Sequence, residues 1–292
     1  MGAAGPGISD LEGATVPDEK YEMDPDGYLR ELVGPWAEEK HERIKKYVDT
    51  YRHVRAKFAR NTTTYIDLFC GPGRGRIRDT KKVIDGSPLV AFRSAQKGGQ
   101  PFTHLHLGDM RADLVDAACA RVRAANGHAT GYARPALDAV DAVLRGLNRQ
   151  GLHFVVLDPY KLESLSFQLI QKFAVLKRVD MLLHVSAMDL TRNLDKYIED
   201  GTIDVFAPGW RDVVDFKNLN QEKTRAAIFA YWCSLVEKLG FQSPKSDLVK
   251  GSGNQRLYWL AFISREPIAN KFWNSIRNVS GQSGFDFMAG EG

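Results

Sequence analysis

Apolar side chains recur at helical spacing from about Pro35 to Phe58. They lie three or four residues apart, and charged side chains fill the positions between them. The apolar positions are Trp36, Ile44, Tyr47, Val48, Tyr51 and Val54, and the charged ones are Glu38, Glu39, Lys40, Arg43, Lys45 and Lys46. This period predicts an amphipathic helix ahead of the first strand.

Short apolar runs then alternate with helical patterns. The predicted strands are Thr64–Phe69, Thr103–Leu107, His128–Ala133, His153–Leu157 and Met181–Val185. The predicted helices between them are Pro88–Gln96, Ala112–Ala124, Pro135–Leu147 and Leu165–Leu176. Strands joined by crossover helices indicate a parallel sheet with helices on both faces. The unbroken apolar run at 154–157 fits a strand that is buried on both sides.

The alternation stops after Ser186. Residues 187–220 are mixed and rich in aromatics, and we expect an insertion next to the functional site. The elements predicted beyond it are a helix at Gln221–Leu239, strands near Ser246–Val249 and Arg256–Ile263, and a helix from Pro267. The last two strands complete a seven-stranded, mostly parallel sheet with an antiparallel end.

Length and composition favour one domain. A chain of 292 residues with 43% hydrophobic residues suits a single α/β domain with additions. Residues 1–27 are rich in Gly, Pro, Ala and acidic residues and predict a disordered tail. We therefore expect one domain over 28–292, with a helix at its start and the 187–220 insertion.

Cys70, Cys119 and Cys233 are far apart and show no CxxC spacing. This argues against a disulfide framework and against a zinc or other metal site, and favours a reducing cytoplasmic compartment. No apolar run is long enough to span a membrane. The first residues do not have the pattern of a signal peptide, so no membrane partner is expected.

A net charge of +4 and a pI of about 8.8 form a mild basic excess. Charge alone leaves two interpretations open, a nucleic-acid partner or an ordinary solvated surface.

The first strand ends in a glycine-containing loop. Segment 65–73 reads YIDLFCGPG, which resembles the D-x-F-x-G-x-G motif of class I, S-adenosylmethionine-dependent methyltransferases. In that motif Asp67 would accept a hydrogen bond from the methionine ammonium, and Phe69, Gly71 and Gly73 would border the cofactor, because glycine lets a backbone approach a ligand. The alternative is a tight turn after a strand. The segment lacks the features of a dinucleotide fingerprint or a P-loop.

A basic segment separates this loop from the next helix. Five of the nine residues at 74–82 are basic: Arg74, Arg76, Arg78, Lys81 and Lys82. They could contact nucleic-acid phosphates beside the site, or they could form a solvated loop. Ser87 and Pro88 look like the cap and first turn of the helix that follows.

Acidic residues follow the second strand and begin a later helix. Asp109 is placed to bind the ribose hydroxyls of an adenosyl group, or else to cap the helix that begins near Arg111. Asp138 is a weaker candidate for the adenine edge, and it could simply be exposed.

The fourth strand ends in Asp158, Pro159 and Tyr160. Asp158 could orient an exocyclic amine, Pro159 stiffens the turn, and Tyr160 could stack on a base. The segment resembles the D-P-P-Y motif of methyltransferases that act on adenine or cytosine, although it has only one proline. The alternative is a strand-terminal turn with a packed tyrosine.

Taken together, these motifs resemble the three-Cys-motif partner protein family, from about Trp36 to Trp273. The matching segments are Glu39-Lys40-His41 with Tyr47, then 65–73, Gly86-Ser87-Pro88-Leu89 with Ala91, Leu157-Asp158-Pro159-Tyr160, and Leu257-Tyr258-Trp259-Leu260. The family is named after an accompanying radical-SAM-type protein with three cysteines. The resemblance implies a Rossmann-like class I methyltransferase fold, and it places Lys40 and His41 at the cofactor pocket. From the residues alone, both could equally lie on a solvated helix face.

The leading hypothesis is an S-adenosylmethionine-dependent methyltransferase acting on a nucleic-acid base amino group. Methyl transfer from a sulfonium depends on placement and desolvation, so it needs no nucleophilic triad. The alternative is a non-catalytic, methyltransferase-like partner of a three-Cys-motif protein. A nuclease is a weaker option, because no metal-ligand spacing supports it.

Overall fold

A computed structural model describes residues 19–58, 62–250 and 256–277 of the chain. Its centre is a seven-stranded sheet in the order β10-β11-β9-β8-β3-β6-β7. The strands are β3 (Thr63–Asp67), β6 (His104–Asp109), β7 (Ala129–Ala133), β8 (Leu152–Leu157), β9 (Val179–Val185), β10 (Lys245–Lys250) and β11 (Arg256–Ser264). Only β11 runs against the other strands, because it pairs antiparallel with both of its neighbours. The predicted seven-stranded, mostly parallel sheet is confirmed.

The order β7-β6-β3-β8-β9 is that of a doubly wound, Rossmann-like sheet. The chain moves outward from β3 to β7 and then returns to the other side of β3 at β8. In such sheets ligands bind beyond the carboxyl ends of the strands where this reversal occurs. The topology therefore draws attention to the ends of β3 and β8.

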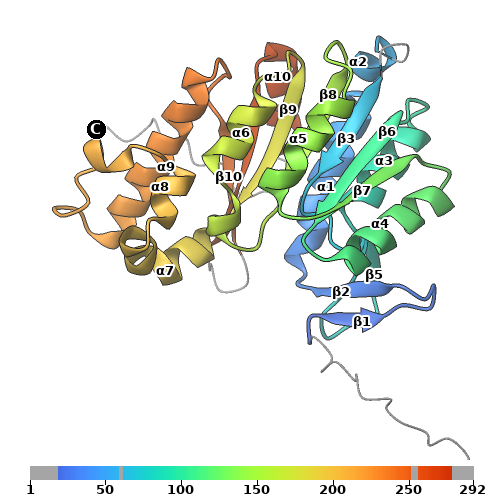
Figure 1. The fold of residues 1–292 in the computed structure, drawn as a ribbon, viewed down its shortest axis with the longest axis horizontal. Helices are drawn as coiled ribbons and strands as arrows, with labels where there is room; N and C mark the ends of the chain where they lie inside the picture. The colour runs from blue at the N-terminus through green and yellow to red at the C-terminus, as the bar shows by residue number, and fades with distance from the viewer. Residues whose placement is uncertain (1–18, 59–61, 251–255, 278–292) are drawn as a thin grey trace, which may run out of the picture.

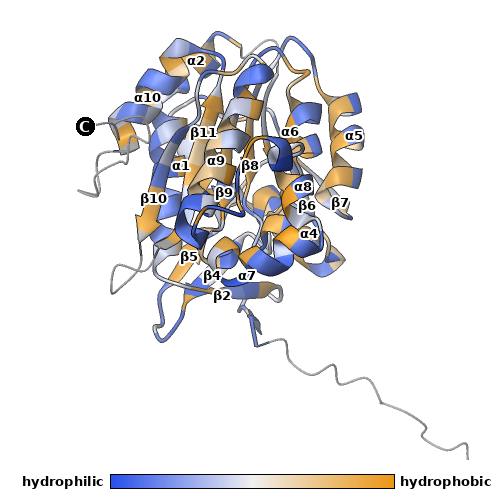
Figure 2. Ribbon diagram, turned by 90° about the vertical axis from the view of Figure 1, so that its left-hand side faces the viewer, coloured by the Kyte–Doolittle hydropathy of each residue, from blue (hydrophilic) through white to orange (hydrophobic). Residues whose placement is uncertain are grey.

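Helices cover both faces of the sheet, as predicted (Figures 1 and 2). One face packs on α1 (Trp36–Thr50), α2 (Arg52–Ala56), α3 (Ser87–Lys97), α4 (Ala112–Ala124) and α10 (Pro267–Arg277). The other packs on α5 (Ala136–Gly146), α6 (Phe167–Phe173), α7 (Ala187–Glu199), α8 (Thr202–Phe206) and α9 (Gln221–Lys238). The short 3₁₀ helices are η1 (Leu162–Ser164) and η2 (Trp210–Asp212). Central strands β3 and β8 are buried at every residue, which explains the apolar run at 154–157 of β8.

The insertion expected at 187–220 is mostly helical and belongs to the core. It contains α7, α8 and η2, and Phe206 stacks on Trp232 of α9 with ring centroids 5.5 Å apart. Only its first turn reaches the functional site described below, through Met188.

A second, four-stranded sheet corrects two expectations. Its order is β1-β2-β4-β5, and its strands are β1 (Tyr21–Met23), β2 (Leu29–Val33), β4 (Arg74–Ile77) and β5 (Val83–Asp85). Residues 19–27 are therefore not part of a tail, and the basic segment is not one continuous loop. Both expectations were wrong because these short strands are rich in charges, and the pairing of β2 with β4 joins residues more than forty positions apart. Residues 1–18 of the predicted tail lie outside the described residues.

No helix within 19–58, 62–250 and 256–277 is long and apolar enough to cross a membrane.

Candidate functional site

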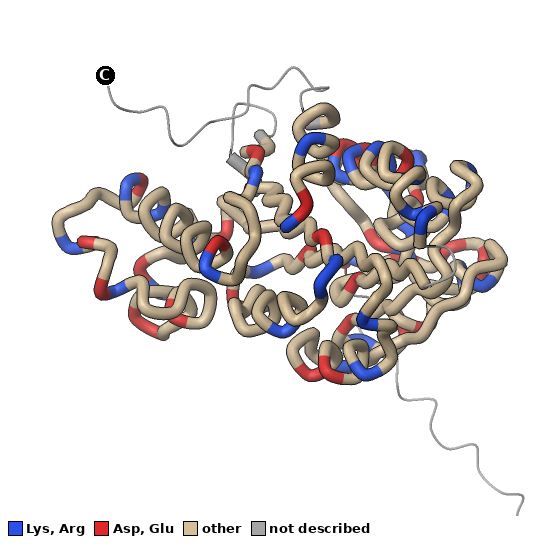
Figure 3. The backbone as a smooth tube through the Cα atoms, turned by 90° about the horizontal axis from the view of Figure 1, so that it is seen from above, with Lys and Arg blue, Asp and Glu red and all other residues tan. Residues whose placement is uncertain are grey.

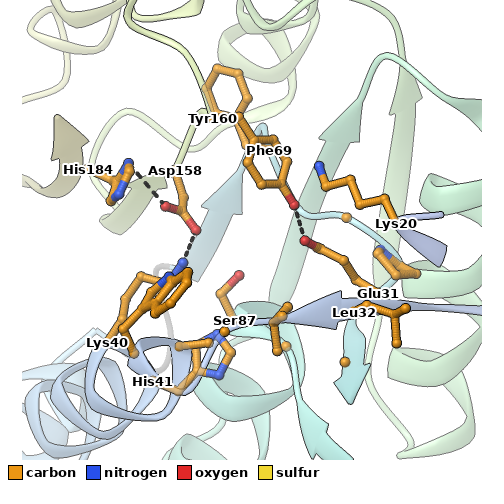
Figure 4. A pocket seen from close by; sticks show the side chains of 18 of the residues that line it. Lys20, Glu31, Leu32, Lys40, His41, Phe69, Ser87, Asp158, Tyr160 and His184 are labelled. Carbon is orange, nitrogen blue, oxygen red and sulfur yellow. Dashed lines mark hydrogen bonds and ion pairs between the residues drawn. The ribbon is translucent and has the colours of Figure 1, made fainter. Parts of the chain in front are cut away.

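A cavity of about 350 Å³ lies where the carboxyl ends of the main strands meet the small sheet. Figure 4 shows side chains from both sheets and from α1 around it. Among the predicted residues, the lining includes Lys40, His41, Phe69, Gly71, Gly73, Arg74, Arg78, Asp109, Asp158, Pro159 and Tyr160. The structure therefore brings most of the predicted cofactor-binding and catalytic residues to one cavity, at the reversal point of the sheet.

Asp67 lies behind the cavity wall. It is fully buried and is not among the lining residues. One carboxylate oxygen accepts a hydrogen bond from the Phe69 N–H at 3.1 Å, and the other accepts from the hydroxyls of Tyr65 at 3.0 Å and Ser87 at 2.6 Å. Burial raises the pKa of Asp67 to about 6, although the Ser87 hydrogen bond acts to lower it. Asp67 thus holds the glycine loop and the start of α3 together, and its predicted contact with a ligand ammonium stays a prediction.

Ser87 was expected to cap α3, but its side chain makes no cap hydrogen bond. Its hydroxyl points instead to Asp67, because burial of that carboxylate leaves it in need of donors.

The glycines of the loop are required by its path. Gly71 and Gly73 have φ values of +52° and +74°, which side chains disfavour. A Cβ on Gly73 would lie 3.2 Å from the Cα of Ala118 in α4, so it would press on the helix rather than fill the cavity. A Cβ on Gly71 would lie 3.5 Å from a carboxylate oxygen of Glu31, which lines the cavity.

Asp109 and Asp138 have different surroundings. Asp109 lines the cavity and accepts a hydrogen bond from the Arg111 N–H at 3.1 Å. Helix α4 begins only at Ala112, and no side chain caps it, so Asp109 shapes the turn before the helix. Asp138 is exposed in the first turn of α5 and is not among the lining residues.

Lys40, Asp158 and His184 lie together at the ends of β8 and β9 (Figure 4). The Lys40 ammonium donates to one Asp158 oxygen, and Nδ1 of His184 lies 3.6 Å from the other. Burial acts to raise the pKa of Asp158, but the Lys40 ammonium holds it below its usual range. Asp158 is therefore an ionised carboxylate paired with an ammonium.

His184 was missed by sequence reasoning. Its Nδ1 lies 3.1 Å from the Pro159 carbonyl oxygen, which can only accept, so Nδ1 carries the proton of the neutral ring. Burial lowers the pKa of His184, which keeps the ring neutral. The available signal was a histidine near the carboxyl end of the otherwise apolar run at 181–185.

His41 has a buried ring nitrogen without a partner. Its Nδ1 has no hydrogen bond in the described part of the chain, although the ring lines the cavity. Burial, and then the Lys40 ammonium, lower the pKa of His41 to about 3, so the ring is neutral at physiological pH. A buried polar atom without a partner needs an explanation, and a ligand hydrogen bond in the cavity is one.

Tyr160 reaches the cavity, but residues of the small sheet engage it. Its hydroxyl donates to Glu31 of β2, and the ammonium of Lys20 lies 2.9 Å from its ring centroid. Burial raises the pKa of Glu31. Neither Glu31 nor Lys20 was predicted, and Lys20 belongs to the segment that had been assigned to the tail.

The arginines of the basic segment are tied to the hairpin formed by β1 and β2. Arg74 pairs with Asp24 at 2.8 Å, and Arg76 pairs with Glu22 at 2.6 Å. Arg78 donates to the Leu32 carbonyl oxygen at 3.1 Å. Lys82 pairs with Glu38, whereas Lys81 is exposed. Figure 3 shows acidic and basic positions interspersed along the chain, and phosphate contact by this segment stays a prediction.

No protein-family model matches the chain, and no curated protein matches it. Among solved structures, protein LPL1258 from Legionella pneumophila is similar with a TM-score of 0.49 and 9% identity, over 82% of this chain and 91% of that one. A SAM-dependent methyltransferase from Anabaena variabilis is similar with a TM-score of 0.33 and 11% identity, over 80% and 98%. Protein PH0226 from Pyrococcus horikoshii is similar with a TM-score of 0.32 and 12% identity, over 75% of this chain and 89% of that one.

Proposed function

We propose that this chain is an S-adenosylmethionine-dependent methyltransferase that acts on an amino nitrogen, with a nucleic-acid base amine as the acceptor that the sequence motif suggests. The observation that carries the proposal is the convergence of the glycine loop, Asp109 and Asp158 on one cavity at the reversal point of a doubly wound sheet. This is where such folds bind adenosyl ligands.

The lining fits the cofactor in size and chemistry. About 350 Å³ is within the range of small-ligand pockets. Asp109 offers a carboxylate to ribose hydroxyls, and the unpartnered Nδ1 of His41 offers a further polar contact. When bound, the cofactor would supply an electrophilic methyl group. The chain would then hold the acceptor amine against Asp158 and exclude water.

Calorimetry and thermal shift with S-adenosylmethionine and its demethylated product test this proposal. We expect a dissociation constant in the micromolar range, roughly −8 kcal/mol. Gly71→Val should abolish binding, because its side chain would enter the cavity beside Glu31. Gly99→Val is the matched control, since Gly99 also has a positive φ (+71°) but has open space around its Cβ position. A wild-type protein that gives neither heat nor a thermal shift would overturn the proposal.

One observation favours a second candidate, a non-catalytic partner of a three-Cys-motif protein. Both side chains expected to hold a base already contact a lysine of this chain. Asp158 accepts a hydrogen bond from Lys40, and the Tyr160 ring lies against the ammonium of Lys20. Mass spectrometry of nucleic acid from cells with and without the protein separates the candidates. A methylated base that disappears with a folded Asp158→Ala variant supports catalysis. Unchanged nucleic acid together with co-purification of the three-Cys-motif protein supports the partner role.

A further inference from the structure

The acceptor side of the cavity already holds an alkylammonium group from this chain. Lys20 precedes β1 and extends into the cavity toward Tyr160 (Figure 4). Its ammonium lies 2.9 Å from the Tyr160 ring centroid and 5.6 Å from that of Tyr21. A side chain from the edge of the small sheet thus occupies the ring face that a substrate base would use.

The surroundings of Lys20 suit a cation better than a neutral base. Aromatic rings attract an ammonium through their negative faces, even where the ring is partly exposed, as Tyr160 is. The carboxylate of Glu31 adds a formal negative charge, and it is held by the Tyr160 hydroxyl. Burial raises the pKa of Glu31, and the positive charge of Lys20 acts in the opposite direction, to lower the pKa of this carboxyl group. A flat, neutral base would gain the ring contact but would remove one of the two ammonium groups, Lys20 and Lys40, whose charges act on this carboxylate.

We propose that this end of the cavity is a subsite for a lysine-type alkylammonium, that the methyl acceptor is a lysine side chain, and that Lys20 of the same chain is the first acceptor. The proposal rests on the proposed function for the methyl donor. It specifies the amino nitrogen of the proposed function as that of a lysine side chain, whereas the sequence motif suggests a base amine.

The chemistry balances with groups that are present. The Lys20 ammonium gives a proton to the Glu31 carboxylate, which passes it to solvent. The freed lone pair of Nζ forms a bond to the methyl carbon. The carbon–sulfur bond of the donor breaks, and its electron pair stays on sulfur, so the positive charge moves from sulfur to nitrogen. The product is a methylated ammonium that still fits the Tyr160 ring, and one proton is released for each methyl group.

The subsite can be tested without any cofactor. Calorimetric titration of n-butylammonium should show at least tenfold tighter binding to Lys20→Ala than to the wild-type protein, because the variant leaves the subsite vacant. Tyr160→Ala in the Lys20→Ala background should lose this gain. Neutral n-butanol is the control ligand and should discriminate between the proteins far less. Equal binding of n-butylammonium to Lys20→Ala and wild type would overturn the subsite.

Methylation is read from the mass of the protein itself. Purified wild-type protein incubated with S-adenosylmethionine should gain a methyl group, and peptide fragmentation should locate it at Lys20. Lys20→Arg should lose the methyl group, whereas Lys81→Arg, which removes an exposed lysine outside the cavity, should keep it. The fraction methylated per minute should not depend on protein concentration, because the reaction is intramolecular.

The two proposals fail in different ways. Donor binding by calorimetry with Lys20 unmodified would overturn the assignment of Lys20 and leave the proposed function standing. A methyl group on other lysines with Lys20 spared would also overturn it. Absence of donor binding would remove the proposed function itself.

Discussion

Lys40 of α1 and Asp158 at the end of β8 form an ion pair across 118 residues of sequence. Their side chains are only 16% and 19% exposed, and His184 lies on the other side of the carboxylate. The pair joins the first helix to the strand end that delivers the predicted catalytic motif. It also means that an acceptor amine at Asp158 must share the carboxylate with Lys40 or displace it.

Lys40→Met should destabilise the protein by about 1–3 kcal/mol, because it leaves a partly buried carboxylate without its partner. Asp158→Asn in that background should cost less than it does alone, which gives a coupling energy on the order of 1–2 kcal/mol in a double-mutant cycle. Urea unfolding at pH 7 measures all four proteins. Lys45→Met, at an exposed position of the same helix, is the matched control.

The coupling should also depend on pH in a defined direction. Because the pKa of Asp158 is lowered in the folded protein, its stabilisation is present above the pKa of the unfolded chain and is lost as the pH falls through the folded pKa. We therefore expect the cycle to give a smaller coupling energy in acid than at pH 7. A cycle without coupling at pH 7 would show that the ion pair contributes nothing.

Asp67 should make stability depend on pH in the opposite sense. Its pKa is raised to about 6 from an ordinary 3.8, so between these values the folded state holds a proton that the unfolded state lacks. The contribution of Asp67 to the free energy of unfolding is fully present below the unfolded-state pKa. It is lost as the pH rises through the folded-state pKa of about 6, by roughly 3 kcal/mol in total. Asp67→Asn should remove this fall, because an amide oxygen can accept from the Phe69 N–H and the amide NH₂ can donate to the Tyr65 and Ser87 hydroxyls.

The measurement is the difference in unfolding free energy between wild type and Asp67→Asn from pH 4 to pH 8. Asp180, which is also buried with a pKa of about 6, is present in both proteins, so its effect cancels. A difference that stays constant over this range would show that Asp67 is ionised throughout.

The main sheet was predictable because its strands are encoded locally. β8 is buried at every residue, so its apolar run at 154–157 stands out, and Asp158 was found because it directly follows that run. The small sheet was not predictable in this way. β1, β2 and β4 carry charges at strand positions, and their pairing depends on contacts such as Arg76 with Glu22, which are 54 residues apart.

The same reason explains the missed site residues. Lys20 and Glu31 reach the cavity only because the small sheet folds over the ends of the main strands. His184 lies in a strand that was predicted, but its role depends on Pro159, 25 residues earlier. Long-range contacts of this kind leave no spacing pattern in a single sequence.

Arg121 should be a main support of the glycine loop. Its side chain is 3% exposed, and it donates to the carbonyl oxygens of Pro72 at 2.7 Å and Leu29 at 2.8 Å while it pairs with Asp26. Arg121→Met should destabilise the protein by roughly 3–5 kcal/mol, because buried acceptors and a carboxylate lose their donor. Urea unfolding measures this loss, and hydrogen exchange should be faster in β1 and β2.

Arg123→Met is the control for Arg121, since Arg123 lies on the same helix but is exposed. We expect it to stay within about 0.5 kcal/mol of wild type. Unchanged stability and unchanged exchange in Arg121→Met would show that the hairpin is held by other contacts.

Any nucleic-acid binding by the basic segment should depend on Lys81 more than on Arg76. Arg76 is bound by the Glu22 carboxylate at 2.6 and 2.7 Å, so its charge is largely cancelled, whereas Lys81 is exposed and makes no ion pair with the described residues. Each phosphate contact that is lost should lower the slope of log affinity against log salt concentration by about one. We expect Lys81→Ala to show this change in fluorescence-anisotropy titrations with a short oligonucleotide, and Arg76→Ala to show much less. Lys97→Ala, at the end of α3, is the control for loss of general charge. Equal slopes for the Lys81, Arg76 and Lys97 variants would mean that this segment does not contact the backbone of the nucleic acid.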